Sequence, residues 1–314
     1  MSVRRRSQLE NEERVITDLR QTLEFQKDLP VSAVIAPNIL IPRSFNSIEA
    51  AIAKDFIRHT RSEFKRFDDQ RPVYATLAIS RNALLDKEEL ISFLNDITVM
   101  ENSPEGFYLL VAVNSGEARS EIFNADVVAG WMFLNYVLNA NGFKVINGYS
   151  DLLSPFLAAA GGDYGATGWS GTLRAFSIDR FLPTVGGGRQ PIPRYMSLGL
   201  FNRITFYELN NLRDMPGILN GLSTDSLYVA DEGSEPQRNK EVLQSWQALQ
   251  TLLANTPKGA FGLCETLVKS ALKLYTQAEA LLPTPWEKRS NSEHLSDLAD
   301  GIRSFRRLAE LEAS

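Results

Sequence analysis

The sequence has few of the residues that build metal sites and nucleophilic catalytic centres. Its 314 residues include one cysteine, Cys264, and two histidines, His59 and His294. A closed zinc site needs about four Cys, His or carboxylate ligands, so we predict no structural zinc within the chain. Cys264 lies in an apolar helical pattern typical of a small buried side chain, and both histidines lie in charged helical segments where we expect them to be solvated. The usual Ser-His-Asp and Cys-His catalytic arrangements are therefore not indicated.

Long hydrophobic runs are also absent. No apolar run reaches the roughly 18 residues of a membrane-spanning helix. The first thirty residues have a basic start followed by a charged helical pattern, not the apolar segment of a secretory signal. We therefore predict a cytoplasmic protein that does not enter a membrane. The net charge of −5 argues against a protein that coats nucleic acid, because phosphate binding needs concentrated Lys and Arg.

Alternating strand-like and helix-like segments make up most of the first 232 residues. The strand-like runs are residues 32–41, 72–80, 106–114, 144–150, 163–169, 194–201 and 226–231. Helical patterns follow most of them, and one begins with a capping-box signature at Asp86 and Glu89. Strands that are apolar throughout indicate a parallel sheet covered on both faces. We predict an α/β fold with a TIM-like (β/α) barrel, in which residues 174–181 are a candidate eighth strand; an open doubly wound parallel sheet is the alternative.

Three amphipathic helical patterns with no strand between them follow residue 233. Proline-containing segments at 257–259 and 283–285 separate these helices. Their leucines recur at helical spacing and need an apolar partner. We therefore divide the chain into a barrel-like domain, residues 1–232, and a C-terminal helical subdomain, residues 233–314. The helices are also a candidate docking surface for a protein partner.

An arginine-rich tract lies between Tyr164 and Arg213. It contains six arginines, no lysine and two acidic residues, within an acidic chain. The arginines are Arg174, Arg180, Arg189, Arg194, Arg203 and Arg213. Arginine binds phosphate oxygens through paired hydrogen bonds, and the glycines of the GGGR segment allow a ligand to approach the backbone closely. The tract predicts a site for a phosphorylated or nucleotide-like anion, or for a segment of single-stranded nucleic acid. The alternative is that these arginines pair with carboxylates of the C-terminal helices, which supply Glu235, Glu241, Glu265, Glu279 and Glu287.

Functional side chains of a barrel collect at the carboxyl ends of its strands. On this basis the candidate ligand-binding residues are Asn114, Tyr149, Trp169, Arg174, Arg189 and Arg194. Asp151 and Asp231 directly follow or end predicted strands and are candidate carboxylates for acid–base chemistry. Helix N-capping is an alternative explanation for Asp151. No motif identifies a cofactor or a reaction.

The order TGW…LRAFS…GGR…PRYMS, residues 167–197, resembles a segment of uncharacterised bacterial proteins. The resemblance covers a short part of the chain and implies no activity. Two function hypotheses follow from the sequence. The first is a barrel-type protein that binds an anionic ligand. The second is a non-catalytic scaffold subunit of a multi-protein bacterial system for nucleic-acid processing or phage defence.

Overall fold

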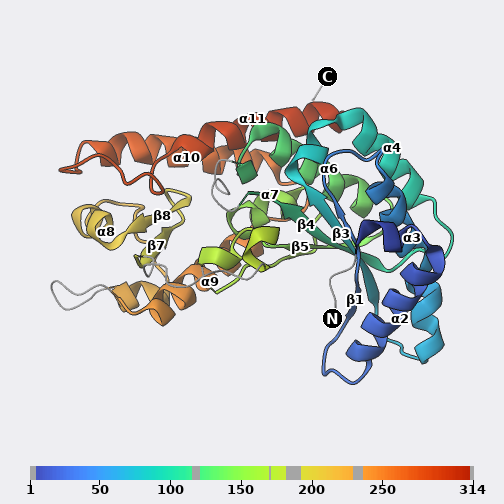
Figure 1. Cartoon of the computed structure of the whole chain (residues 1–314). Coiled ribbons are helices and arrows are strands. Elements are labelled where there is room, and N and C mark those ends of the chain that lie inside the picture. The colour runs from blue at the N-terminus through green and yellow to red at the C-terminus, as the bar shows by residue number, and fades with distance from the viewer. Residues whose placement is uncertain (1–4, 115–120, 170, 182–191, 229–235, 312–314) are drawn as a thin grey trace.

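A parallel sheet with its helices forms one end of the molecule, and an arm of helices with a short hairpin extends from it (Figure 1). The computed structural model describes residues 5–114, 121–169, 171–181, 192–228 and 236–311. The hairpin and the helices α8, α9 and α10 come from the later part of the chain, as the colour gradient of Figure 1 shows.

Six strands form the sheet in the order β1-β3-β4-β5-β6, and β2 also pairs with β3. All of these pairs are parallel. The strands are β1 (Val34–Ala36), β2 (Leu40–Ile41), β3 (Val73–Ser80), β4 (Gly106–Ala112), β5 (Lys144–Gly148) and β6 (Tyr164–Gly165). Because the strands follow chain order, right-handed crossovers place the connecting helices on the same face of the sheet.

Four of the described helices connect successive strands. They are α3 (Ile48–Phe64), α4 (Lys87–Thr98), α6 (Ala125–Ala140) and α7 (Ser154–Ala159), with short 3₁₀ segments η1 (Lys65–Phe67), η2 (Arg81–Leu85) and η3 (Asp151–Leu153). The side chains of Ser47, Asp86 and Asn124 accept backbone N–H bonds at the starts of α3, α4 and α6. In Figure 1, α4 and α6 lie above the strands of the sheet.

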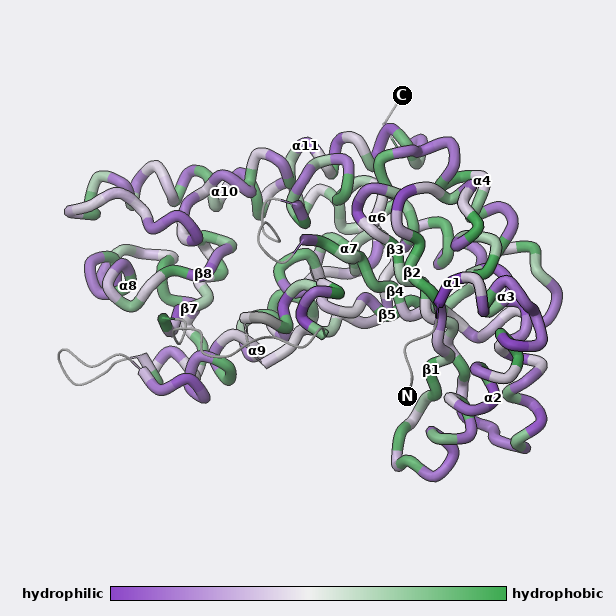
Figure 2. Tube along the Cα trace, viewed as in Figure 1, coloured by the Kyte–Doolittle hydropathy of each residue, from purple (hydrophilic) through white to green (hydrophobic). Residues whose placement is uncertain are grey.

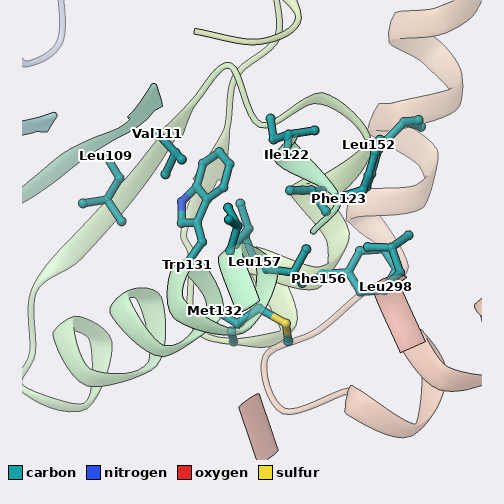
Figure 3. Close-up of a cluster of buried hydrophobic side chains, with 14 of the residues drawn as sticks. Leu109, Val111, Ile122, Phe123, Trp131, Met132, Leu152, Phe156, Leu157 and Leu298 are labelled. Atoms are coloured by element: carbon teal, nitrogen blue, oxygen red, sulfur yellow. The ribbon is translucent and has the colours of Figure 1, made fainter. Parts of the chain in front are cut away.

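One face of the sheet packs tightly against these helices. Leu109 and Val111 of β4 and Trp131 of α6 are each at most 1% exposed, and Figure 3 shows the indole next to both side chains. The indole nitrogen of Trp131 donates to Asn147 Oδ1 at 2.8 Å, so its only donor is satisfied in the core. This face therefore supplies the main hydrophobic core.

The opposite face of the sheet is less covered. Its side chains alternate along each strand with those of the packed face, and they belong to neither apolar cluster of the described residues. We call this surface the open face; it is lined by Tyr74, Ala78, Tyr108, Leu110, Ala112 and Ile146. Tyr108, Leu110 and Ile146 are half-buried, whereas Tyr74, Ala78 and Ala112 are each 7% exposed. Parallel sheets are usually covered on both faces, so the open face departs from the expected arrangement.

The N-terminal helices cover the outer strand β1. Helices α1 (Arg6–Leu9) and α2 (Glu12–Lys27) build a smaller cluster with β1 and α3. Gln26 of α2 exchanges two hydrogen bonds with the backbone of Ile35, at 2.8 and 3.1 Å. These bonds satisfy backbone groups of an edge strand that would otherwise be open to another chain.

The arm is built around an antiparallel hairpin, β7 (Arg194–Ser197) and β8 (Asn202–Thr205). The other elements of the later chain are η4 (Gly171–Leu173), η5 (Ile178–Phe181), α8 (Phe206–Leu212), η6 (Ser223–Tyr228), α9 (Arg238–Ala254), α10 (Phe261–Glu279) and α11 (Glu293–Leu308). Gln244 of α9 binds both backbone groups of Met196 and so fixes the hairpin to this helix. Helix α11 returns along α6, where Phe305 is fully buried in the main core. In Figure 2, hydrophobic and hydrophilic residues alternate along α10 and α11, as expected of helices with one buried side.

The structure confirms a mostly parallel α/β sheet but not a closed barrel. The described strands form an open sheet, which fits the open parallel-sheet alternative. The sheet stays open because the described residues after β6 add no further strand to it. Residues 194–201, predicted as one parallel strand, are half of an antiparallel hairpin and its turn, and residues 174–181 contribute only a single bridge, between Phe176 and Ala112.

The strand predicted at residues 226–231 is also wrong over the part that the structure describes. Ser223–Tyr228 form a 3₁₀ segment, and the Tyr228 ring is fully buried. The predicted domain boundary at residues 232 and 233 lies outside the described residues.

Among the described helices, none combines the length and the apolar character needed to cross a membrane.

Candidate functional site

Two arginines of the arginine-rich tract pair with carboxylates of the C-terminal region. Arg174 Nη2 lies 2.8 Å from Glu241 Oε1 of α9. Arg194 Nη2 lies 2.6 Å from Glu287 Oε2, and its Nη1 donates to Ser290. The ion-pair interpretation is thus confirmed for Arg174 and Arg194. Arg174 joins the segment after β6 to α9, and Arg194 joins β7 to the segment between α10 and α11, so we do not place them in the ligand site proposed below.

Asp151 takes part in a buried ion pair that the sequence did not predict. It accepts hydrogen bonds from Arg203 Nη1 and Nη2 at 2.6 and 2.7 Å, and from Thr167 Oγ1 at 2.9 Å. Burial raises the pKa of this carboxyl, but the charge and hydrogen bonds of Arg203, with smaller contributions from Arg174 and Thr167, bring the pKa below its ordinary value. The N-capping interpretation is wrong, because Asp151 is the first residue of η3 and its side chain binds Arg203.

Arg174, Arg203, Asp151 and Glu241 form one buried network with no formal net charge. Burial lowers the pKa of Arg174, and the neighbouring Arg203 lowers it further. Glu241 Oε2 has no hydrogen-bond partner in the part of the chain that the structure describes. Breaking such a network leaves an uncompensated buried charge. We therefore assign it to joining β5 with the hairpin and α9.

A row of aromatic rings lies at the carboxyl ends of β4 and β5. The ring of Tyr149, directly after β5, lies 5.5 Å from the ring of Phe176, which lies 5.9 Å from the ring of Phe181. We call these three residues the aromatic row. Phe181 at its end is 63% exposed. Tyr149 has a φ of 56°, a conformation that costs a non-glycine residue about 1–3 kcal/mol and often marks a functional site.

Backbone contacts join the aromatic row to the open face. Ala112, the last residue of β4, forms a parallel bridge with Phe176, and Val113 N–H donates to the Phe176 carbonyl at 3.0 Å. The bridge places Phe176 in register with Ala112 of the open face. The side chain of Tyr108 lies over Gly148 of β5. A Cβ added to Gly148 would be 2.5 Å from the Tyr108 hydroxyl. Burial, and secondarily the nearby Tyr149, raise the pKa of the Tyr108 phenol.

Arg180 provides positive charge beside the aromatic row. It precedes Phe181 in η5, and its Nη1 donates to the Ala175 carbonyl at 3.0 Å. Burial lowers the pKa of its guanidinium, while the nearby Asp179 and Tyr149 act in the opposite direction. A guanidinium that is partly shielded from water binds anions more strongly than one in bulk solvent.

The other predicted site residues lie around this edge or outside the described residues. Asn114 lies two residues after the end of β4, and its backbone N–H donates to Glu121 Oε2, while Glu121 also pairs with Arg81. Trp169 follows β6 and is 58% exposed, but it makes no ring contact with the aromatic row among the described residues. Arg189 and Asp231 lie outside the described residues.

Among the predicted ligand-binding residues that the structure describes, Tyr149 is therefore the one that belongs to the aromatic row. Tyr108, Phe181 and Arg180 were not among the candidates. Arg180 and Phe181 lie in the segment RAFSIDRF, residues 174–181, which has aromatic residues on both sides of two charged ones. This segment was predicted as part of the arginine-rich tract and as a candidate strand, and its aromatic residues were not assigned to the site.

The cysteine and the histidines occupy structural positions. Cys264 is buried as predicted, and burial raises the pKa of its thiol to about 12, so it is no nucleophile at neutral pH. His294 is buried, contrary to the expectation of a solvated residue, and its Nε2 lies 3.1 Å from the Phe201 carbonyl. His59 Nε2 lies 2.6 Å from Glu12 Oε1. Across the described ranges, no three His, Cys, Asp or Glu side chains gather as a metal site.

Comparison of the chain with protein-family models, with curated proteins and with solved structures finds no match.

Proposed function

We propose that this protein binds an anionic ligand, phosphorylated or nucleotide-like, at the carboxyl ends of β4 and β5. The observation that carries the proposal is the position of Arg180 and the aromatic row at the edge of a sheet face whose side chains belong to neither apolar cluster of the described residues. In open α/β sheets, ligands bind beyond the carboxyl ends of the strands. The proposal concerns binding and includes no reaction.

Arg180 is the residue that we assign to the anion. Arg174, Arg194 and Arg203 each pair with a carboxylate. Arg180 is assigned to the anion because of its position: it directly precedes the exposed Phe181 and lies near Tyr149 and Asp179. A charge-assisted hydrogen bond to phosphate is worth about 1.5–3 kcal/mol, or roughly ten- to a hundredfold in affinity.

Isothermal titration with inorganic pyrophosphate and with nucleoside diphosphates tests this proposal. We expect Arg180→Gln to weaken binding by about ten- to a hundredfold with no change in melting temperature beyond a few degrees. Arg66→Gln is the control, since Arg66 is 60% exposed and lies in η1, before β3 begins. Equal affinity in the wild type and Arg180→Gln, or no binding of any of these anions at millimolar concentration, would contradict the proposal.

A protein-docking role through the C-terminal helices is the second candidate function. Leu243 and Trp246 lie three residues apart on α9 and are 53% and 45% exposed. Large exposed apolar side chains on one helix face favour a protein contact. Size-exclusion chromatography with the other proteins encoded beside this chain would detect such a complex, and Trp246→Glu should abolish it.

A further inference from the structure

Phe181 is a ring held at the surface, at the end of a fixed series of rings. It is 63% exposed, while its neighbour Phe176 is half-buried and tied to β4 through the bridge with Ala112. Ser177, next in the chain, is 1% exposed, which fixes the segment between the two rings. A ring supported in this way keeps one side available without having to be ordered when a ligand binds.

The geometry favours a planar partner for Phe181. Successive rings of the aromatic row are 5.5 and 5.9 Å apart with interplanar angles of 55° and 46°, within the range of attractive aromatic pairs. A planar ring placed against Phe181 would extend this series by one member. An aliphatic ligand of the same charge gains less from the aromatic surface.

The charge beside the row limits the chemistry of that partner. Arg180 adjoins Phe181 in η5, and its guanidinium lies near Asp179 and near Tyr149 at the other end of the row. A ligand that contacts both Phe181 and Arg180 needs a planar ring and an anionic group in one molecule. Nucleotides have this arrangement, since a base and a phosphate are joined through one sugar.

We infer that the ligand of this site is a nucleotide whose base stacks on Phe181 while its phosphate is bound by Arg180. The inference rests on the proposed function and narrows it to one class of anion. The same chemistry is offered by a free nucleotide and by one unit of a single strand, so the test includes both sources.

The experiment compares anions with and without a base. Wild-type protein is titrated with inorganic pyrophosphate, with ADP, GDP, CDP and UDP, and with an eight-residue single-stranded oligonucleotide of thymidine. Base stacking on an aromatic side chain contributes about ten- to a hundredfold in affinity. We expect at least one diphosphate or the oligonucleotide to bind at least tenfold more tightly than pyrophosphate. Tighter binding of the oligonucleotide than of any diphosphate identifies a strand as the source, and the reverse order identifies a free nucleotide.

The variant Phe181→Leu removes the ring and keeps an apolar side chain at an exposed position. We expect it to lower nucleotide affinity to that of pyrophosphate and to leave pyrophosphate binding unchanged. Phe25→Leu on α2 is the matched control, because Phe25 is 70% exposed and far along the chain from the site. Circular dichroism confirms that both variants are folded.

The outcomes separate the two proposals. If pyrophosphate and nucleotides bind equally and Arg180→Gln weakens both, the anion site stands and the nucleotide inference is overturned. If Phe181→Leu leaves a tenfold preference for nucleotides intact, the base binds elsewhere and the inference is also overturned. If none of these anions binds, the proposed function itself fails.

Discussion

Leu109 and Leu110 are neighbours on β4 and point to opposite faces of the same sheet. Leu109 is 1% exposed and lies beside Trp131 under α6, whereas Leu110 is half-buried and belongs to neither hydrophobic cluster. The strands have apolar side chains on both faces, yet among the described residues only those of one face belong to the hydrophobic clusters. The packed face therefore supplies the stability, and the open face, with the aromatic row at its carboxyl edge, is the part of the sheet that remains for a ligand.

The largest expected difference in the free energy of unfolding is between two tryptophan substitutions, one in the packed core and one at the exposed edge. Trp131→Ala removes a fully buried indole and one of the two hydrogen bonds that Asn147 Oδ1 accepts, so we expect the free energy of unfolding to fall by about 3–5 kcal/mol. Trp169→Ala, at a side chain that is 58% exposed, should change it by about 0.5 kcal/mol or less. Urea denaturation followed by circular dichroism measures both. A similar loss in the two variants would show that the exposed edge is part of the core.

The buried network that joins the sheet to the arm should be next in magnitude. Asp151→Asn leaves Arg203 buried without its charge partner, and we expect a loss of about 3 kcal/mol at pH 7. Asp96→Asn is the control, since Asp96 is 53% exposed and pairs with Lys54 at the surface. That change should cost less than about 1 kcal/mol. A loss below 1 kcal/mol for Asp151→Asn would contradict the role of the network.

The same ion pair predicts a pH dependence. Burial raises the pKa of Asp151, but Arg203, with Arg174 and Thr167, brings it below its ordinary value. A carboxylate whose pKa is lowered in the folded state stabilises the fold above the pKa of the unfolded chain, about 3.9. That contribution is lost as the pH falls below about 4 and passes through the pKa of the folded state. Thermal unfolding between pH 7 and pH 3 should therefore show a smaller decrease for Asp151→Asn than for the wild type, and parallel curves would refute the assignment.

Two glycines of the sheet should respond differently to alanine. A Cβ at Gly106 would lie 2.1 Å from the Lys144 carbonyl oxygen, so the backbone of β5 must move, and we expect a loss of about 1–3 kcal/mol. A Cβ at Gly148 would meet the hydroxyl end of Tyr108, on the open face, where the side chain can shift. We expect Gly148→Ala to cost less than about 1 kcal/mol, as measured by urea denaturation. An equal or larger loss of stability for Gly148→Ala would mean that the Tyr108 side chain cannot shift.

Local signals in the sequence predicted much of the sheet and its helices. The cap at Asp86 is formed as expected, although Glu89, the second member of the capping box, turns to Ser44 and the Phe45 N–H. The runs at residues 72–80 and 106–114 contain β3 and β4 because both are long and apolar. The strand predicted at 226–231 is wrong over its described part, since an apolar segment of this length also fits a buried turn such as the one at Tyr228.

The site was harder to predict because its contacts are distant in the chain. Arg174 meets Glu241, and Arg203 meets Asp151, across 67 and 52 positions. Charge composition alone does not distinguish such pairs from a ligand clamp. The open face could not be predicted from the sequence for a different reason. Leu110 and Ile146 are as apolar as the residues of the packed face, so periodicity does not show that they lie outside the hydrophobic clusters of the described residues.

The most direct test of the difference between the two faces is a pair of substitutions on β4, Leu109→Ala and Leu110→Ala, compared by urea denaturation. The residue type, the strand and the change are the same, and only the face differs. We predict a loss of about 2–5 kcal/mol in the free energy of unfolding for Leu109→Ala and of less than about 1 kcal/mol for Leu110→Ala. Equal losses in the two variants would show that the second face is packed as tightly as the first, and would contradict the open face on which the ligand site depends.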